Sequence, residues 1–284
     1  MWPAPLPESL PLLERLTAPD QMGHMLILLV LVAARPLGFI ALQPIFGRFK
    51  LNTGYLRGAV IVAMCCPVLP GALATLAADP GLASPDRIPG LIARELVVGA
   101  LMGLLTGLPF WAAQTAGDLI DQQRSASMAN LIDPGAGGEA SVSGTFLMLV
   151  CLLVLAASGA LTQALFGPLL RSYAVIGLFQ PLPPVDARLA GQVLALLDHL
   201  LRSGVLLALP VVVPLLLTEI AIVVATKYMP QLNAMFLSMS VKQGVHVLLM
   251  LLGAVMLAGY AVTLLSSPAL GPEALRGFFP KATP

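Results

Sequence analysis

Two long runs without any charged residue, 96–117 and 140–170, constrain this chain more than any other feature. Each is long enough to cross the hydrocarbon core of a bilayer, which takes about 20 apolar residues in a helix. Only 10% of the chain is charged, against about a quarter in soluble domains, and the mean hydropathy is +0.91. We therefore expect an all-α integral membrane protein without a soluble domain, because backbone in lipid must satisfy its own hydrogen bonds.

About six apolar helical regions follow one another along the chain, and we expect several to be broken or kinked. Prolines inside these regions mark the expected irregularities: Pro67, Pro70, Pro109, Pro210 and Pro214. Proline removes a helical hydrogen bond and clashes with the preceding turn. For the same reason we expect Arg35-Pro36 to interrupt the first region and Gly167-Pro168 to close the fourth.

A single membrane domain is expected at 22–265, between an exposed N-terminal lead-in at 1–21 and a short tail at 266–284. The loop 44–57 contains no acid and three basic residues, Arg48, Lys50 and Arg57. Because loops rich in lysine and arginine stay on the cytoplasmic side, we expect this loop to face the cytoplasm.

A polar island at 117–139 separates the two uncharged runs. Four of its polar residues have the spacing of one helix face: Asp118, Asp121, Gln122 and Ser125. Arg124 follows Asp121 by three residues, which allows an ion pair, and Asp133-Pro134 is expected to stop the helix. Spacing alone leaves two interpretations open: a solvated loop between two membrane helices, or a structured polar site.

Glu219 lies inside an apolar run, where an acid costs about 2.5–3.5 kcal/mol unless it is paired, hydrated or protonated. It is either an ion or proton site, or an acid packed against a neighbouring helix or subunit. No second acid lies one or two turns away, which favours packing. A second polar island at 227–242 follows, from Lys227 to Lys242, and we expect Lys242 to begin the last helix.

No residue pattern favours catalysis, a metal site or a cofactor. The three histidines are scattered, without a partner at metal-ligand spacing: His24, His199 and His246. Neither Ser158-Gly159 nor Ser203-Gly204 has a histidine or lysine at a position that would suggest a nucleophile–base pair. The net charge of +1 gives no nucleic-acid footprint. The cysteines lie in apolar runs and are expected to be small buried hydrophobic residues: Cys65, Cys66 and Cys151.

The two islands together resemble one known family. Gly-Asp-Leu-Ile-Asp-Gln-Gln-Arg-Ser-Ala-Ser-Met-Ala at 117–129, followed by Asp133-Pro134, is similar to the SctT family of type III secretion export-apparatus proteins, which is related to flagellar FliR. The second island resembles the same family through Pro230, Gln231, Asn233 and Lys242, and Ser-Met-Ser at 238–240 looks like the injectisome version. The motifs around Arg35 and Arg57 also fit. The resemblance spans roughly 25–265.

The resemblance implies an export-gate component of the bacterial inner membrane. Proteins similar to this one assemble with SctR- and SctS-type subunits, and an SctU-type protein docks on that core. Unfolded secreted proteins pass through the assembly, and membrane lipid surrounds part of it. The runner-up interpretation is a secondary transporter of a small solute that uses Glu219, although the sequence shows no inverted repeat. A membrane enzyme is third, because no catalytic set is present.

Overall fold

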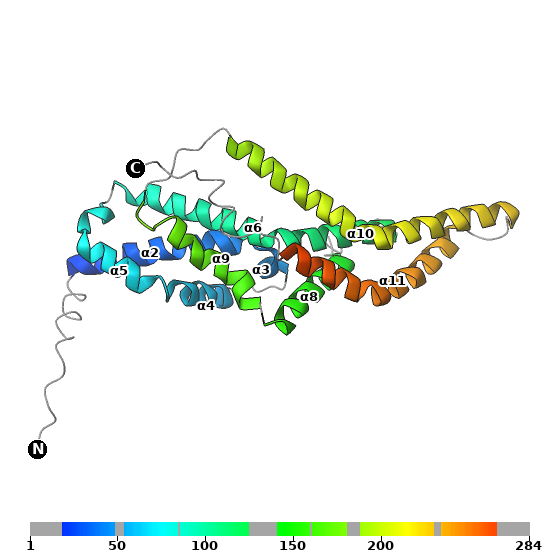
Figure 1. Ribbon diagram of the computed structural model, residues 1–284, viewed down its shortest axis with the longest axis horizontal. Coiled ribbons are helices and arrows are strands. Elements are labelled where there is room, and N and C mark those ends of the chain that lie inside the picture. Colours follow the sequence, from blue (N-terminus) through cyan, green and yellow to red (C-terminus); the bar gives the residue numbers. More distant parts are fainter. Residues whose placement is uncertain are drawn as a thin grey trace, which may run out of the picture. The chain divides into compact units, whose positions relative to one another are not determined.

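The computed structural model describes residues 19–48, 54–84, 86–124, 141–159, 161–180, 188–229 and 234–265. Every regular element within these ranges is a helix, which confirms the all-α prediction (Figure 1). The α-helices are α2 (Pro19–Leu42), α3 (Pro44–Arg48), α4 (Gly54–Cys65), α5 (Leu69–Ala78), α6 (Ile88–Gln123), α8 (Val142–Ala157), α9 (Leu161–Val175), α10 (Arg188–Tyr228) and α11 (Ala234–Leu265). A 3₁₀ turn, η1 (Pro80–Ala83), follows α5.

Four of these helices are long and apolar enough to cross a membrane: α2, α6, α10 and α11. The α4–α5 and α8–α9 pairs each pass the same test as one broken span, so the described residues hold up to 6 spans. This agrees with the six expected regions. The α4–α5 pair is bent by 56°, at the position of Pro67 and next to Pro70, as expected.

Two of the predicted interruptions are wrong. Pro36 lies inside α2, which continues through Arg35-Pro36 without a break, and Pro168 lies inside α9. A proline removes only one helical N–H, and a membrane helix packed among neighbours tolerates that loss. The predicted start of the last helix at Lys242 is also wrong, because α11 already begins at Ala234.

The chain forms two compact units. The first comprises Met1–Leu104, Pro168–Pro184 and Ala282–Pro284. In it, α2 packs against α4 and α5 around an apolar cluster that contains Leu28, Leu31, Val32, Ala72, Leu91 and Leu178. Backbones of α2 and α6 touch, because a Cβ added to Gly99 would overlap the carbonyl oxygen of Arg35. Glycines at helix crossings allow such close approach in membranes.

The second unit comprises Leu105–Gly167 and Val185–Lys281. Its helices α10 and α11 pack along each other, and α11 also packs against α8 (Figure 1). The ribbon of α10 bends in its middle part (Figure 1), and Pro210 and Pro214 lie inside this helix. Gly117 of α6 meets Gly144 of α8 so closely that a Cβ at Gly117 would overlap the α8 backbone.

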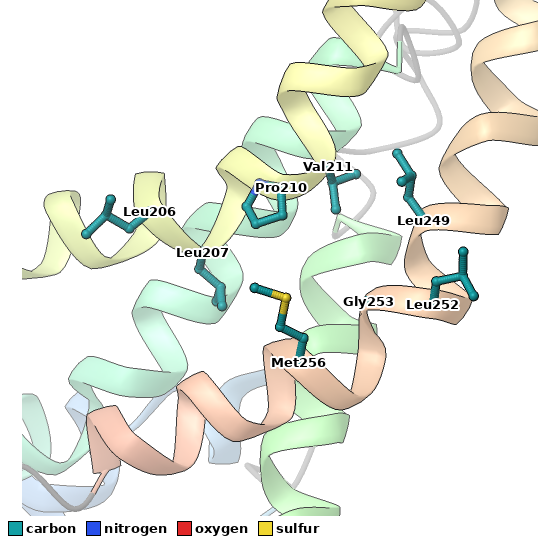
Figure 2. Close-up of a pocket in the computed structure, with 8 residues that line it drawn as sticks. All are labelled: Leu206, Leu207, Pro210, Val211, Leu249, Leu252, Gly253 and Met256. Atoms are coloured by element: carbon teal, nitrogen blue, oxygen red, sulfur yellow. The ribbon is translucent and has the colours of Figure 1, made fainter.

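The apolar faces of α10 and α11 are largely uncovered. Only 28% of the apolar window of α10 and 17% of that of α11 is buried, against 67% for α6. Between α10 and α11 lies a cavity of about 290 Å³. Figure 2 shows that Met256 extends from α11 toward Leu207 and Pro210 of α10 at this cavity. Lipid or other protein chains must cover these faces, because they are too apolar for water.

The cysteines follow the expected burial only in part. Cys151 is buried and Cys65 is half-buried, whereas Cys66 is exposed. The burial prediction is therefore wrong for Cys66, which lies at the break between α4 and α5.

Candidate functional site: buried charge clusters

A buried ion-pair cluster in the first unit joins α2 to α6. Arg35 Nε donates to Glu95 Oε2 at 2.6 Å, and Arg35 Nη2 donates to Glu95 Oε1 at 3.0 Å. This is the bidentate geometry that makes arginine–carboxylate pairs strong. Arg94 Nη2 also contacts Glu95 Oε1. The side chains of Arg35 and Glu95 are 0% exposed, so both charges are fully buried.

The same two arginines hold the segment at the end of α9. Arg35 donates to Ser172 Oγ at 3.0 Å and to the carbonyl oxygen of Ile176 at 3.0 Å. Arg94 donates to the carbonyl oxygens of Gly177 and Leu178 at 2.6 and 2.9 Å. Helix ends leave carbonyls unpaired, and cations there interact favourably with the helix dipole. The first cluster therefore fixes α2, α6 and the end of α9 to one another.

Tyr173 completes the first cluster. The guanidinium carbon of Arg35 lies 3.9 Å from the centre of its ring, within the range of a cation–π contact. The tyrosine hydroxyl reaches the carbonyl oxygen of Val32 on α2 at 3.5 Å. Each nitrogen of the Arg35 guanidinium thus has a hydrogen-bond partner, and its face contacts Tyr173. These contacts explain why an arginine inside an apolar helix is tolerated.

A second cluster, in the second unit, is built around Asp121 near the end of α6. Its carboxylate accepts hydrogen bonds from Ser141 Oγ at 2.7 Å, Ser143 Oγ at 2.5 Å and the Ser143 backbone N–H at 3.2 Å. Ser141 is the N-cap of α8, where its side chain accepts from the Gly144 N–H. Asp121 therefore lies at the N-terminus of α8, where the helix dipole stabilises an anion.

The predicted ion pair between Asp121 and Arg124 is confirmed, with Arg124 Nη2 3.1 Å from Asp121 Oδ1. Arg124 also donates to Gln243 Oε1 of α11 at 3.3 Å. Both charged side chains of the pair are mostly buried, at 12% and 13% exposure. Asp121 and Arg124 are therefore packed against α8 and α11, and the solvated-loop interpretation is wrong for these two residues.

Glu219 pairs with Lys242 across α10 and α11. Lys242 Nζ lies 2.9 Å from Glu219 Oε2, with the lysine buried and the carboxylate 43% exposed. Gln123 of α6 ties both residues together, because its side-chain amide donates to Glu219 at 3.3 Å and its backbone carbonyl accepts from Lys242 at 3.2 Å. The acid is thus packed against a neighbouring helix, as the spacing favoured, but it is not fully buried.

The remaining predicted residues lie outside the two clusters and the Glu219–Lys242 pair. Asp118 is half-buried and Gln122 is exposed on α6, whereas Asp121 is buried. Arg57 is half-buried on α4, and Lys227 is exposed near the end of α10. Five predicted residues lie outside the described part of the chain: Asp133, Pro134, Pro230, Gln231 and Asn233.

The sequence predicted no site role for several residues that the structure places in the two clusters or beside the Glu219–Lys242 pair: Arg94, Glu95, Gln123, Ser141, Ser143, Ser172, Tyr173 and His246. Ser141 carried a usable signal, since a serine directly before an apolar run is a typical N-cap. The contacts of Gln123 and Ser143 depend on how α6, α8 and α10 meet, and no local pattern encodes that arrangement.

The second cluster is unsuited to nucleophilic chemistry. In serine-nucleophile triads the histidine lies between serine and acid, and takes the serine proton. Here Ser143 lies between them, hydrogen-bonded to Asp121 and 3.4 Å from His246 Nε2. Among the described residues, no three metal-binding side chains gather at one point. What the clusters do is hold helix ends and helix faces together.

These features define a class: an integral membrane protein of several broken helices, with buried ion pairs that join its helices. Residues 26–267 match the family model described as bacterial export proteins, family 1. The chain therefore belongs to the bacterial export proteins of family 1, the SctT/FliR family.

Relatives of both branches are similar to this chain. It is 34% identical over 227 residues to the surface presentation of antigens protein SpaR of Salmonella typhimurium, covering 78% of this chain and 83% of that protein. It is 25% identical over 243 residues to the Yop proteins translocation protein T of Yersinia pestis, covering 85% and 91%. It is 26% identical over 224 residues to the flagellar biosynthetic protein FliR of Bacillus subtilis, covering 78% and 84%.

Proposed function

We propose that this chain is a core component of a type III secretion export gate in the bacterial inner membrane. It assembles with SctR- and SctS-type subunits, docks an SctU-type protein, and lines part of the path for unfolded secreted proteins. The observation that carries this proposal is the family match over nearly the whole chain. The similarity to SpaR and the Yop translocation protein T supports the injectisome branch.

The distribution of apolar surface supports a place inside an assembly. The exposed faces of α10 and α11 present large side chains such as Leu251 and Met256, which subunits or lipid can cover. Lys242 and Glu219 lie on these same two helices, and Glu219 is half-exposed. A half-exposed ion pair at a lipid-facing position is costly, whereas beside another subunit or a wet lumen it is tolerated.

The two rival functions have less support. A solute transporter would use Glu219 as a free carboxylate in the membrane, but this acid is engaged by Lys242 and Gln123. We also propose that the chain has no catalytic activity, since Ser143 is not arranged as a nucleophile. A reproducible hydrolase or transferase activity of the purified chain, lost on a single substitution, would contradict that statement.

The proposal is tested in a bacterium that lacks its own SctT-type gene. Supplying this chain with its neighbouring R-, S- and U-type genes should restore export of a tagged substrate, and the tagged chain should copurify with the R- and S-type subunits. Solute uptake by vesicles containing the chain alone, without any such copurification, would favour the transporter instead.

The second island offers a more local test, although Pro230, Gln231 and Asn233 lie outside the described residues. We propose that this segment faces other subunits or the lumen. A cysteine at position 233 should crosslink to a partner subunit, in a variant whose native cysteines are replaced. A cysteine at Leu251, on the exposed apolar face of α11, provides the comparison position. Labelling of position 233 by a lipid-phase probe alone would oppose the proposal.

A further inference from the structure

His246 is a buried imidazole in α11, and among the described residues its Nδ1 atom has no hydrogen-bond partner. Its other ring nitrogen, Nε2, lies 3.4 Å from the hydroxyl oxygen of Ser143 on α8. Nothing in the function proposed above uses the titration of this ring. Histidine is nevertheless the side chain that most readily changes charge near neutral pH, and a buried basic nitrogen without a partner calls for an explanation.

The hydrogen bonds of Ser143 determine which ring nitrogen of His246 carries the hydrogen. A serine hydroxyl has one hydrogen to donate, and Ser143 Oγ lies 2.5 Å from Asp121 Oδ1. Asp121 is paired with Arg124 and accepts a second hydroxyl, that of Ser141, so it is an ionised carboxylate that only accepts. Ser143 therefore donates to Asp121 and accepts from the Nε2–H of His246, which leaves Nδ1 with a free lone pair.

We propose that Nδ1 of His246 is a proton-binding site that controls the contact between α8 and α11. At lower pH a proton passes from hydronium to Nδ1: one N–H bond forms, one O–H bond of hydronium breaks, a water molecule is left, and the neutral ring becomes an imidazolium. The new N–H then lies in a buried position where the described part of the chain offers no acceptor. Because a buried donor must find a partner, the ring has to turn or α11 has to shift from α8.

The charged groups around the ring offer a protonated His246 no unengaged anion, which favours a movement of the ring or of α11. The charged groups that act on it are Asp121 and Arg124 of α6. Arg124 repels an imidazolium, and Asp121 is already engaged by Arg124 and the two serines. The charged residues Glu219 of α10 and Lys242 of α11 pair with each other. The described residues of α8 include no aspartate, glutamate, lysine or arginine. A protonated His246 therefore competes for Asp121.

The tautomer is measured by nitrogen NMR of the full chain, labelled with ¹⁵N-histidine and held in lipid with its partner subunits. The chain has 3 histidines, so His246→Gln assigns the resonances of this ring. We expect the neutral ring to carry its hydrogen on Nε2 and to lose that preference in Ser143→Ala. A ring that carries its hydrogen on Nδ1 overturns the proposal, as does a ring that stays neutral from about pH 4 to about pH 9.

The coupling to structure is measured by amide hydrogen exchange in α8 over the same pH range. After correction for intrinsic rates, exchange near Ser143 should rise about threefold or more along the titration curve of His246. His246→Gln should abolish this pH dependence, whereas His199→Gln should retain it, because His199 is exposed on α10. The proposal is overturned if the corrected exchange rate near Ser143 does not change along the titration curve, or if its pH dependence persists in His246→Gln. Neither readout depends on protein export, so each can fail while the proposed function stands.

Discussion

At the scale of single residues, Asp121 is held more by α8 than by its ion-pair partner. Two serine hydroxyls and one backbone N–H donate to it, beside the contact with Arg124. The sequence indicated the Asp121–Arg124 pair correctly, because i,i+3 spacing is a local property. It could not indicate the serines, since they meet Asp121 only after α8 has packed against α6.

Because Asp121 has more partners than Arg124, we expect unequal effects when each is replaced by alanine. Arg124→Ala should strongly reduce secretion while the protein still reaches the membrane, because removing one partner of a largely buried pair costs up to about 3–5 kcal/mol. Asp121→Ala should be at least as severe, since it also leaves the α8 N-terminus without its anion. Secretion and membrane protein level are measured together.

The double variant of Asp121 and Arg124 should be less impaired than the sum of the two single losses, because the two residues share one interaction. Exposed Gln122→Ala, between them in the sequence, is the control and should export normally. Normal secretion by both single variants at normal protein level would mean that this packing does not matter to export.

A second prediction concerns the first cluster, where one carboxylate faces two arginines. Glu95→Gln removes the only counter-charge that contacts Arg35 and Arg94 among the described residues, so we expect a loss of roughly 3–5 kcal/mol. The detergent-solubilised protein should aggregate at a clearly lower temperature than wild type. Glu219→Gln should be milder, because its carboxylate is half-exposed. Equal melting of both variants would contradict the role given to this cluster.

At the scale of elements, glycine contacts fix the distance between α2 and α6. The carbonyl oxygens of Arg35 and Phe39 occupy the positions where side chains at Gly99 and Gly103 would be. Gly99→Ala should therefore push the helices apart and cost about 1–3 kcal/mol or more. Gly90→Ala, on the same helix with open space around it, should be neutral or stabilising by up to about 1 kcal/mol. Thermal aggregation of both variants in detergent checks the contrast.

Helix existence was predictable from hydropathy, whereas several helix ends were not. Pro67 and Pro70 do accompany a break, but Pro36 and Pro168 lie within continuous helices. The helix around Pro36 is held by the contact between Arg35 and Glu95. The helix that contains Pro168 is held by the hydrogen bonds from Arg35 to Ser172 and to Ile176. Tertiary contacts of this kind override the local tendency of proline to end a helix, and they are invisible in a single sequence.

At the scale of the whole molecule, we expect the isolated chain to be unstable or prone to aggregate. The reason is the large uncovered apolar surface on α10 and α11. Co-expression with R- and S-type partners should convert aggregated material into a monodisperse complex, measured by size-exclusion chromatography in mild detergent. A well-folded monomer that is indifferent to those partners would show that lipid or detergent alone suffices to cover these faces.

The pairing of Arg35 with Glu95 also sets an order of events during biosynthesis. The two residues are 60 positions apart, and Ser172 is 137 positions from Arg35. At about 5–20 residues per second, the ribosome needs several seconds to deliver Glu95 after Arg35, and longer to deliver Ser172. During that interval α2 carries an unmatched cation, which disfavours release into lipid by about 2.5–3.5 kcal/mol. We therefore expect α2 to remain beside the insertion machinery until α6 arrives, so that the two helices enter the bilayer together.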